Sequence, residues 1–122
     1  SGEILSSVVS NGGKFITKTD IQGKGSNSKG HISCDALLLN DKSRVTAIPK
    51  LFSQNKDSQL THEAYLGKIS SEEIEYLQTK GLGEKKAEEI IVRGFANKSI
   101  EKMPDVIKEK MRLIIEESSK GF

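Results

Sequence analysis

The chain has 122 residues, of which 34% are hydrophobic and 5% aromatic, and it contains no tryptophan. This length fits one domain, and the low apolar content favours stacked aliphatic layers or a part of something larger. With 19 Lys and Arg against 17 Asp and Glu, the net charge of +2 does not predict a polyanionic partner. The single cysteine excludes an internal disulfide. The sequence shows neither a membrane span nor a signal peptide, so we expect a soluble, cytoplasmic protein.

The start of the chain, up to Gln22, has the pattern of two short strands. Two apolar pairs, Ile4-Leu5 and Val8-Val9, precede the turn signal Asn11-Gly12-Gly13, and apolar residues then alternate with polar ones from Phe15 to Ile21. The chain begins within this strand-like sequence and without a methionine. We therefore expect it to be part of a longer protein.

A polar, glycine-rich loop is predicted over residues 23–30. Gly25 and Gly30 have the spacing of a phosphate-binding loop, but that motif then requires Lys followed by Ser or Thr. His31 and Ile32 stand at those positions instead. We interpret the segment as a solvated connection between strands.

Further strand candidates follow, separated by turns. Residues 31–39 are the most apolar of them, and residues 44–48 form the next, which Pro49 should end or confine to a sheet edge. Ile32, Val45 and Leu60 recur at nearly regular intervals, a pattern typical of β-solenoid coils that stack one on the next. A hairpin meander or half of a sandwich has the same spacing, so these alternatives stay open.

After Ser70 the spacing of the apolar residues changes from every second residue to about every 3.6 residues. This change predicts a β domain over residues 1–69, followed in the chain by a helical domain over residues 70–122. Ser70 and Glu73 form a capping box at the start of the first helix, and Gly81 ends that helix. A second helix is predicted over residues 84–96. The third begins near Pro104 and carries an apolar stripe of Ile107, Met111, Ile114 and Ile115.

The residues best suited to chemistry are Cys34, His62 and Glu63, since thiolate, imidazole and carboxylate are all plausible iron ligands. Adjacent strand residues point to opposite faces, so His62 and Glu63 cannot both face Cys34. Aligning the strands places Cys34 and His62 on one face but two strands apart, roughly 9–10 Å. The alternative is a buried cysteine that acts as a small hydrophobe. We interpret His31 as a polar group at the end of a strand rather than a ligand.

The segment between the first two helices gives a competing interpretation. Residues 81–90 match a helix-hairpin-helix pattern, whose glycine-rich hairpin presents backbone N–H groups to a DNA phosphate. Residues 70–122, however, carry 10 Lys and Arg against 11 Asp and Glu, a net charge of −1. Because a phosphate-binding face should be basic, DNA binding is the weaker hypothesis.

Taken together, segments between residues 30 and 95 resemble the carboxy-terminal part of the SufB/SufD family, the scaffold proteins of SUF iron–sulfur cluster assembly. The segments are, in order, GHISCDALLL (30–39), SR (43–44), IP (48–49), THEA (61–64), GKI (67–69), YL (76–77), GL (81–82), Ala87 and IVRGF (91–95). They cross the junction between strands and helices, which makes the resemblance more specific than the hairpin pattern alone.

The resemblance implies a right-handed parallel β-helix whose last coils are residues 1–69, followed by a three-helix domain. It implies that Cys34 receives sulfur and binds the nascent iron–sulfur cluster. Glu63 is then the acidic residue paired with that site, and His62 is its neighbour. The cluster is expected to be transient and to form between subunits.

The resemblance also implies a scaffold rather than an enzyme. Residues 70–122 would dock a SufC-type ABC ATPase, and the β-helix would pair with a SufB/SufD-type subunit or with a second copy. Cys34 favours a SufB-like role over a SufD-like partner without cluster chemistry. The exposed edge of a truncated β-helix predicts self-association through residues 1–50. Neither nucleic acid nor a membrane is an expected partner.

Overall fold

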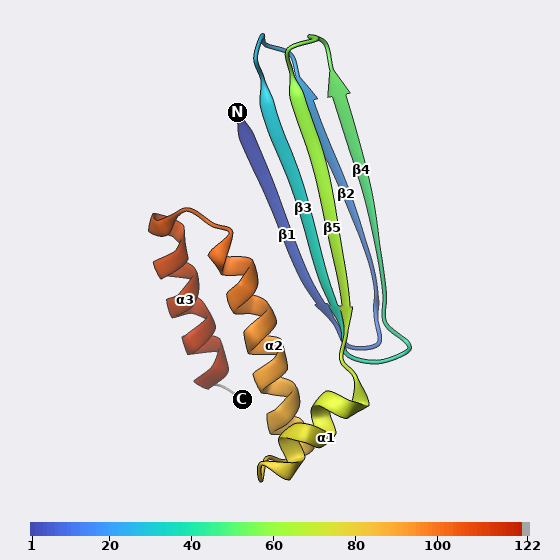
Figure 1. The fold of residues 1–122 in the computed structure, drawn as a ribbon, viewed down its shortest axis with the longest axis vertical. Coiled ribbons are helices and arrows are strands. Elements are labelled where there is room, and N and C mark those ends of the chain that lie inside the picture. The colour runs from blue at the N-terminus through green and yellow to red at the C-terminus, as the bar shows by residue number, and fades with distance from the viewer. Residues whose placement is uncertain (121–122) are drawn as a thin grey trace. The chain divides into compact units, whose positions relative to one another are not determined.

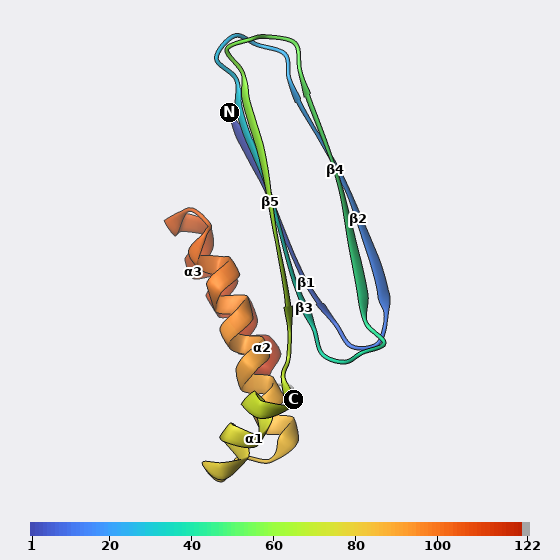
Figure 2. The same cartoon turned by 45° about the vertical axis from the view of Figure 1, so that its right-hand side comes forward.

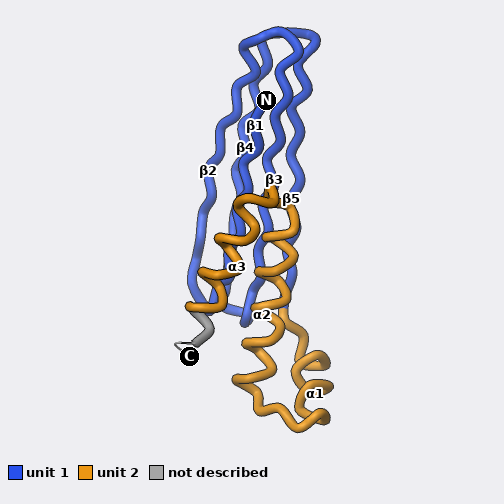
Figure 3. Tube along the Cα trace, turned by 90° about the vertical axis from the view of Figure 1, so that its left-hand side faces the viewer, with its two compact units in different colours: residues 1–68 blue, residues 69–122 orange. Residues whose placement is uncertain are grey.

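The computed structural model describes residues 1–120, which form five strands followed by three helices (Figure 1). The chain divides into two compact units, residues 1–68 with the strands and residues 69–122 with the helices (Figure 3). The protein is therefore of mixed strand and helix type, with the strands first.

The strand unit consists of two parallel sheets. One contains three strands in the order β1–β3–β5, and the other pairs β2 with β4 (Figure 2). Each strand along the chain therefore lies in the opposite sheet from the one before it. The strands are β1 (Gly2–Ser10), β2 (Lys14–Gly23), β3 (Lys29–Leu38), β4 (Arg44–Ser53) and β5 (Gln59–Lys68). Because every pair is parallel, the hairpin-meander alternative is wrong.

The register shows that the repeat is two strands long. Each strand pairs with the next but one along the chain, in all three pairs. Ile32 consequently pairs with His62, and Val45 pairs with Phe15. The predicted stacking of Ile32, Val45 and Leu60 on consecutive strands is wrong, because neighbours in sequence lie in different sheets.

Hydrogen bonds also connect the turn after β1 with the turn after β3, the strand that pairs with β1. Gly12, with a φ of 90°, forms the predicted turn after β1, and its N–H donates to Ser43 Oγ at 2.7 Å. The Ser43 hydroxyl donates in turn to the Ser10 carbonyl at 2.8 Å. Asn40 Nδ2 donates to Asn11 Oδ1 at 2.8 Å. These bonds tie the turn before β2 to the equivalent turn before β4 and so help to hold the register.

Pro49 does not end its strand. It lies inside β4, opposite Thr19 of β2. Among the described strands β4 pairs only with β2, so its other edge needs no N–H donor and tolerates a proline. Of the two outcomes predicted for Pro49, the structure shows the confinement of its strand to a sheet edge and not the end of the strand.

The helical unit contains α1 (Ser71–Thr79), α2 (Glu84–Glu101) and α3 (Asp105–Lys120). Ser70 caps α1 as predicted, since its side chain accepts the Glu73 N–H at 3.1 Å. Gly81, with a φ of 89°, follows the end of α1 in the left-handed conformation that favours glycine. Within the described part of the chain, no helix is long and apolar enough to cross a membrane.

The helix α2 is longer than predicted. The sequence pattern ends it near residue 96, but the structure continues it to Glu101, with Ser99 and Ile100 buried. Burial of these two residues offsets the weak helix preference of the segment before them. The predicted stripe of α3 is only partly covered, since Ile107 is 47% exposed and Ile114 is 56% exposed.

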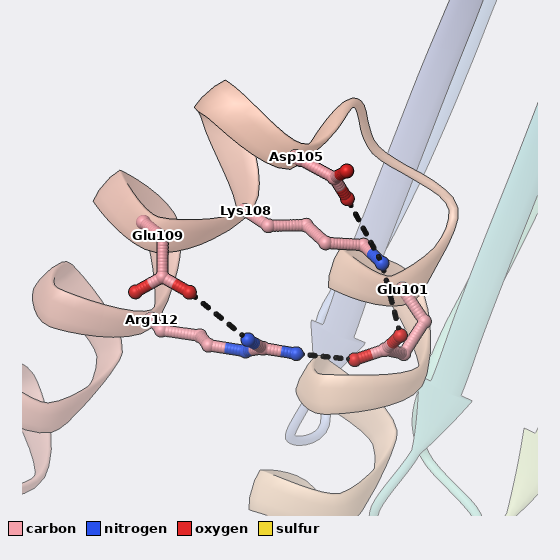
Figure 4. Close-up of polar contacts among 5 residues, drawn as sticks. All are labelled: Glu101, Asp105, Lys108, Glu109 and Arg112. Carbon is pink, nitrogen blue, oxygen red and sulfur yellow. Dashed lines mark hydrogen bonds and ion pairs between the residues drawn. The ribbon is translucent and has the colours of Figure 1, made fainter.

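A cluster of charges connects the end of α2 with α3 (Figure 4). Glu101 accepts a hydrogen bond from Lys108 Nζ at 3.1 Å and another from Arg112 at 2.5 Å. Asp105 and Glu109 add ion pairs to the same two cations, at 3.8 Å and 3.2 Å. The hydrogen bonds from Lys108 and Arg112 hold the pKa of Glu101 below its usual range.

Replacing Glu101 by glutamine is expected to lower the melting temperature of the protein slightly at neutral pH. The lowered pKa means that the carboxylate stabilises the fold above its unfolded pKa of about 4.3, and this contribution disappears as the pH falls through the folded pKa. Melting curves of both proteins should therefore converge in acid. Glu88→Gln is the matched control, because it removes the same charge from α2 outside this cluster. An equal loss in the control would contradict the prediction.

Candidate functional site

Cys34 lies near the middle of β3, the central strand of the three-stranded sheet. It pairs with Ser6 of β1 and Ala64 of β5, and it is only 9% exposed. Its side chain lines a cavity of about 290 Å³ between the two sheets. The other residues that line this cavity are Ser6, Val8, Thr17, Asp35, Ala36, Val45, Ala47, His62, Ala64, Tyr65 and Leu66. The thiol is therefore inside the strand unit and not on its outer surface.

His62 lies on the same face as Cys34 and lines the same cavity. It occupies β5 opposite Ile32, two positions before Ala64, the direct partner of Cys34. The prediction that these residues are two strands apart is wrong, because β3 and β5 are adjacent. Among the described residues, the buried Nε2 atom of His62 has no hydrogen-bond partner. The structure thus brings a thiol and an unsatisfied imidazole nitrogen to one cavity.

Glu63 is on the opposite face of the sheet, as the alternation of strand side chains requires. It pairs with Ser33, whose hydroxyl donates to Glu63 Oε1 at 3.3 Å. The same carboxylate oxygen is 3.6 Å from Nε2 of His31, and Nδ1 of His31 is 2.6 Å from Thr61 Oγ1. We call His31, Ser33, Thr61 and Glu63 the outer-face cluster. Within this chain Glu63 therefore lies apart from Cys34 and His62.

The sequence pattern did not reveal the outer-face cluster. The sequence does contain a pattern that could have revealed it. All four residues have odd numbers, so they lie on one face of their strands, and His31 and Thr61 occupy equivalent positions of the repeat. Recognising this pattern requires knowing that β3 pairs with β5 and not with β4. Apolar spacing alone does not distinguish these two partners.

The surroundings of Cys34 favour the protonated thiol. Burial raises the pKa of the Cys34 thiol, and the negative charge of Asp35 raises it further. A bound cation would reverse this balance, because a coordinated thiol loses its proton. In the part of the chain that the structure describes, no group of three or more His, Cys, Asp or Glu could hold a metal ion. Any metal bound here needs further ligands from water or from another molecule.

The hairpin between α1 and α2 has the predicted local form. Gly83 precedes α2 in an extended conformation and makes no side-chain capping bond. Acidic residues occupy the first turns of both helices, Glu72 and Glu73 in α1 and Glu84 in α2. Carboxylates near a helix N-terminus favour the helix but repel a nucleic-acid phosphate. DNA binding stays a weaker prediction.

Known proteins similar to this chain belong to the family that the sequence resembles. Residues 1–95 match the model of a family described as "SUF system FeS cluster assembly, SufBD core domain". An iron–sulfur cluster assembly SufBD family protein of Pyrococcus horikoshii is 41% identical over 94% of this chain and 26% of its own length.

Two further relatives are each described as an iron–sulfur cluster assembly SufBD family protein. The protein of Archaeoglobus fulgidus is 40% identical over 93% of this chain, and that of Methanothermobacter thermautotrophicus is 34% identical over 100%. The chain spans 31% and 30% of their respective lengths. The family model covers well over half of this sequence, including all five strands. The chain therefore belongs to the SufBD family.

Proposed function

We propose that this chain is part of a scaffold subunit on which the SUF system assembles an iron–sulfur cluster. Membership of the SufBD family supports a role in cluster assembly. The main structural support for the site is that Cys34 and His62 lie on adjacent strands and line the same cavity. In this proposal the cluster is transient cargo, and the protein is a scaffold and not an enzyme.

The five strands are, in this proposal, the last coils of a right-handed parallel β-helix. Two observations support it. Consecutive strands alternate between two parallel sheets, and each strand pairs with the next but one along the chain. Such coils stack on their neighbours, so in a longer protein further strands could pair with the side of β1 that has no partner among the described strands.

Each candidate residue has a role that its chemistry permits. As the thiolate, Cys34 binds iron, or it attacks the outer sulfur of a donor persulfide, so that the donor's S–S bond breaks and the donor leaves as a thiolate. Both steps require the proton of Cys34 to leave. His62 offers a nitrogen ligand from the same cavity through its buried Nε2 atom. Glu63, on the opposite face, serves as an oxygen ligand or proton acceptor where a second subunit approaches β5. Completing the cluster between subunits removes the need for several cysteines in one chain.

Partner binding is proposed for both units. The helical unit docks a SufC-type ABC ATPase, supported by the exposed apolar residues Val106 and Leu113 on α3, at 76% and 61% exposure. The strand unit pairs with a SufB/SufD-type subunit or with a second copy, supported by the edges of its sheets. The family match also favours a cytoplasmic scaffold without nucleic-acid or membrane partners.

Calorimetric titration tests the docking proposal. We expect the chain to bind its cognate SUF ATPase and to give no heat of binding with a DNA duplex. Binding of the duplex alone would instead favour the helix-hairpin-helix alternative.

Anaerobic reconstitution of this chain with its SUF partners tests the cluster site. The native protein is compared with the Cys34→Ser variant by the iron and sulfide that remain bound. Loss of both in the variant supports a SufB-like role. Unchanged cluster formation would assign a SufD-like role, in which the same fold takes no part in cluster chemistry.

A further inference from the structure

The outer-face cluster pairs Glu63, to which the proposed function already gives an oxygen-ligand role, with the imidazole of His31, which that function does not use. His31 and Glu63 lie on adjacent strands, with Nε2 of the histidine 3.6 Å from Oε1 of the carboxylate. Their side chains are 33% and 58% exposed, so the pair lies at the surface of the strand unit. This face of the sheet is opposite the cavity that holds Cys34 and His62.

Thr61 and Ser33 hold the two side chains in place. Nδ1 of His31 is 2.6 Å from Thr61 Oγ1, and the buried Ser33 hydroxyl donates to Glu63 Oε1 at 3.3 Å. When Nδ1 carries the proton and donates to Thr61, the lone pair of Nε2 faces the carboxylate. In this tautomer the lone pair of Nε2 and the carboxylate oxygen can both bind one cation. Metal-binding histidines in proteins characteristically donate their other ring N–H to an oxygen in this way.

The distance between the two atoms agrees with a shared metal ion. At a tetrahedral centre with metal–nitrogen and metal–oxygen bonds of about 2.1 Å, the two ligand atoms are about 3.4 Å apart. The observed 3.6 Å is close to this value. It is too long for an ordinary N–H···O hydrogen bond, whose atoms are usually about 2.9–3.0 Å apart.

We propose that His31 and Glu63 bind one divalent first-row cation, of the class of Zn²⁺, Co²⁺ or Fe²⁺, on the outer face of the β3–β5 sheet. Thr61 and Ser33 orient the two ligands, and water or a partner subunit supplies the remaining ones. His31 is thus a metal ligand and not merely a polar group at the end of a strand. The site lies on the opposite face of the sheet from Cys34, and it shares Glu63 with the cluster role proposed above.

Cobalt(II) is the probe for this site, because its visible absorption reports ligand type and geometry. The titration uses the full chain in the Cys34→Ser background, so that the cavity thiol cannot compete. We expect tetrahedral Co²⁺ bands without thiolate charge transfer. His31→Gln and Glu63→Gln should each abolish these bands. Thr61→Val keeps the branched shape but removes the hydroxyl, and it should weaken binding by about 10- to 100-fold.

His62→Gln is the matched control, since it removes an imidazole from the adjacent strand β5 on the opposite face of the same sheet. Circular dichroism establishes that each variant is folded. Retained binding in His62→Gln, together with loss in His31→Gln, supports the site. The proposal is overturned if the Cys34→Ser protein binds no Co²⁺. It is equally overturned if His31→Gln binds as tightly as its parent, or if only His62→Gln loses the metal.

Discussion

Replacing Cys34 by serine is expected to lower the iron and sulfide bound after anaerobic reconstitution by more than about tenfold. Serine fits the space of the thiol but is a poor ligand for iron and cannot carry a transferred sulfur atom. Because Cys34 is the only cysteine in the chain, no other thiol here can replace it. Its place beside His62 in one cavity makes this the variant with the largest expected functional effect.

Ala64→Ser provides the matched control for this experiment. Ala64 is the direct strand partner of Cys34 and lines the same cavity, so the change adds a hydroxyl there and leaves the thiol in place. We expect the control to retain its cluster. Equal losses in the two variants would show that polarity in the cavity matters and not the thiol. Retention in both would contradict a ligand role for Cys34.

Replacing Ile32 by alanine is expected to lower the free energy of unfolding of the strand unit by about 2–5 kcal/mol. Ile32 has no exposed surface and lies in the central strand of its sheet. Truncation removes most of the buried side chain and leaves a void, since neighbouring strands held by backbone hydrogen bonds cannot close around it. Equilibrium unfolding in urea, followed by circular dichroism, measures the change.

Ile16→Ala is the matched control for that measurement. It makes the same truncation in β2, but Ile16 is 61% exposed. We expect its effect to stay within about 0.5 kcal/mol, as for most surface substitutions. If both variants lose the same free energy, the core does not lie where the structure places Ile32.

Local features of this protein could be predicted from its sequence because each depends on only a few neighbouring residues. Ser70 and Glu73 mark the start of α1, and Gly81 its end. Alternation along a strand was enough to place His62 and Glu63 on opposite faces. The family was also recognisable from residues alone, since its motifs cross the junction between strands and helices in order.

Strand partners, in contrast, were decided only by the tertiary structure. An apolar pattern sets which face of a strand is buried, but it does not say which distant strand lies beside it. Parallel pairing needs a long connection, and here each connection contains a whole strand of the other sheet. For this reason the sequence placed Cys34 and His62 too far apart and did not reveal the contact between His31 and Glu63.

The length of α2 has the same kind of cause. The segment after residue 96 has a weak preference for helix, and it becomes helical because Ser99 and Ile100 are buried. In this protein the sequence by itself determined the local elements, their faces and the family. Packing between strands that are not consecutive in the chain determined which side chains form a site, because only that packing brings them into contact.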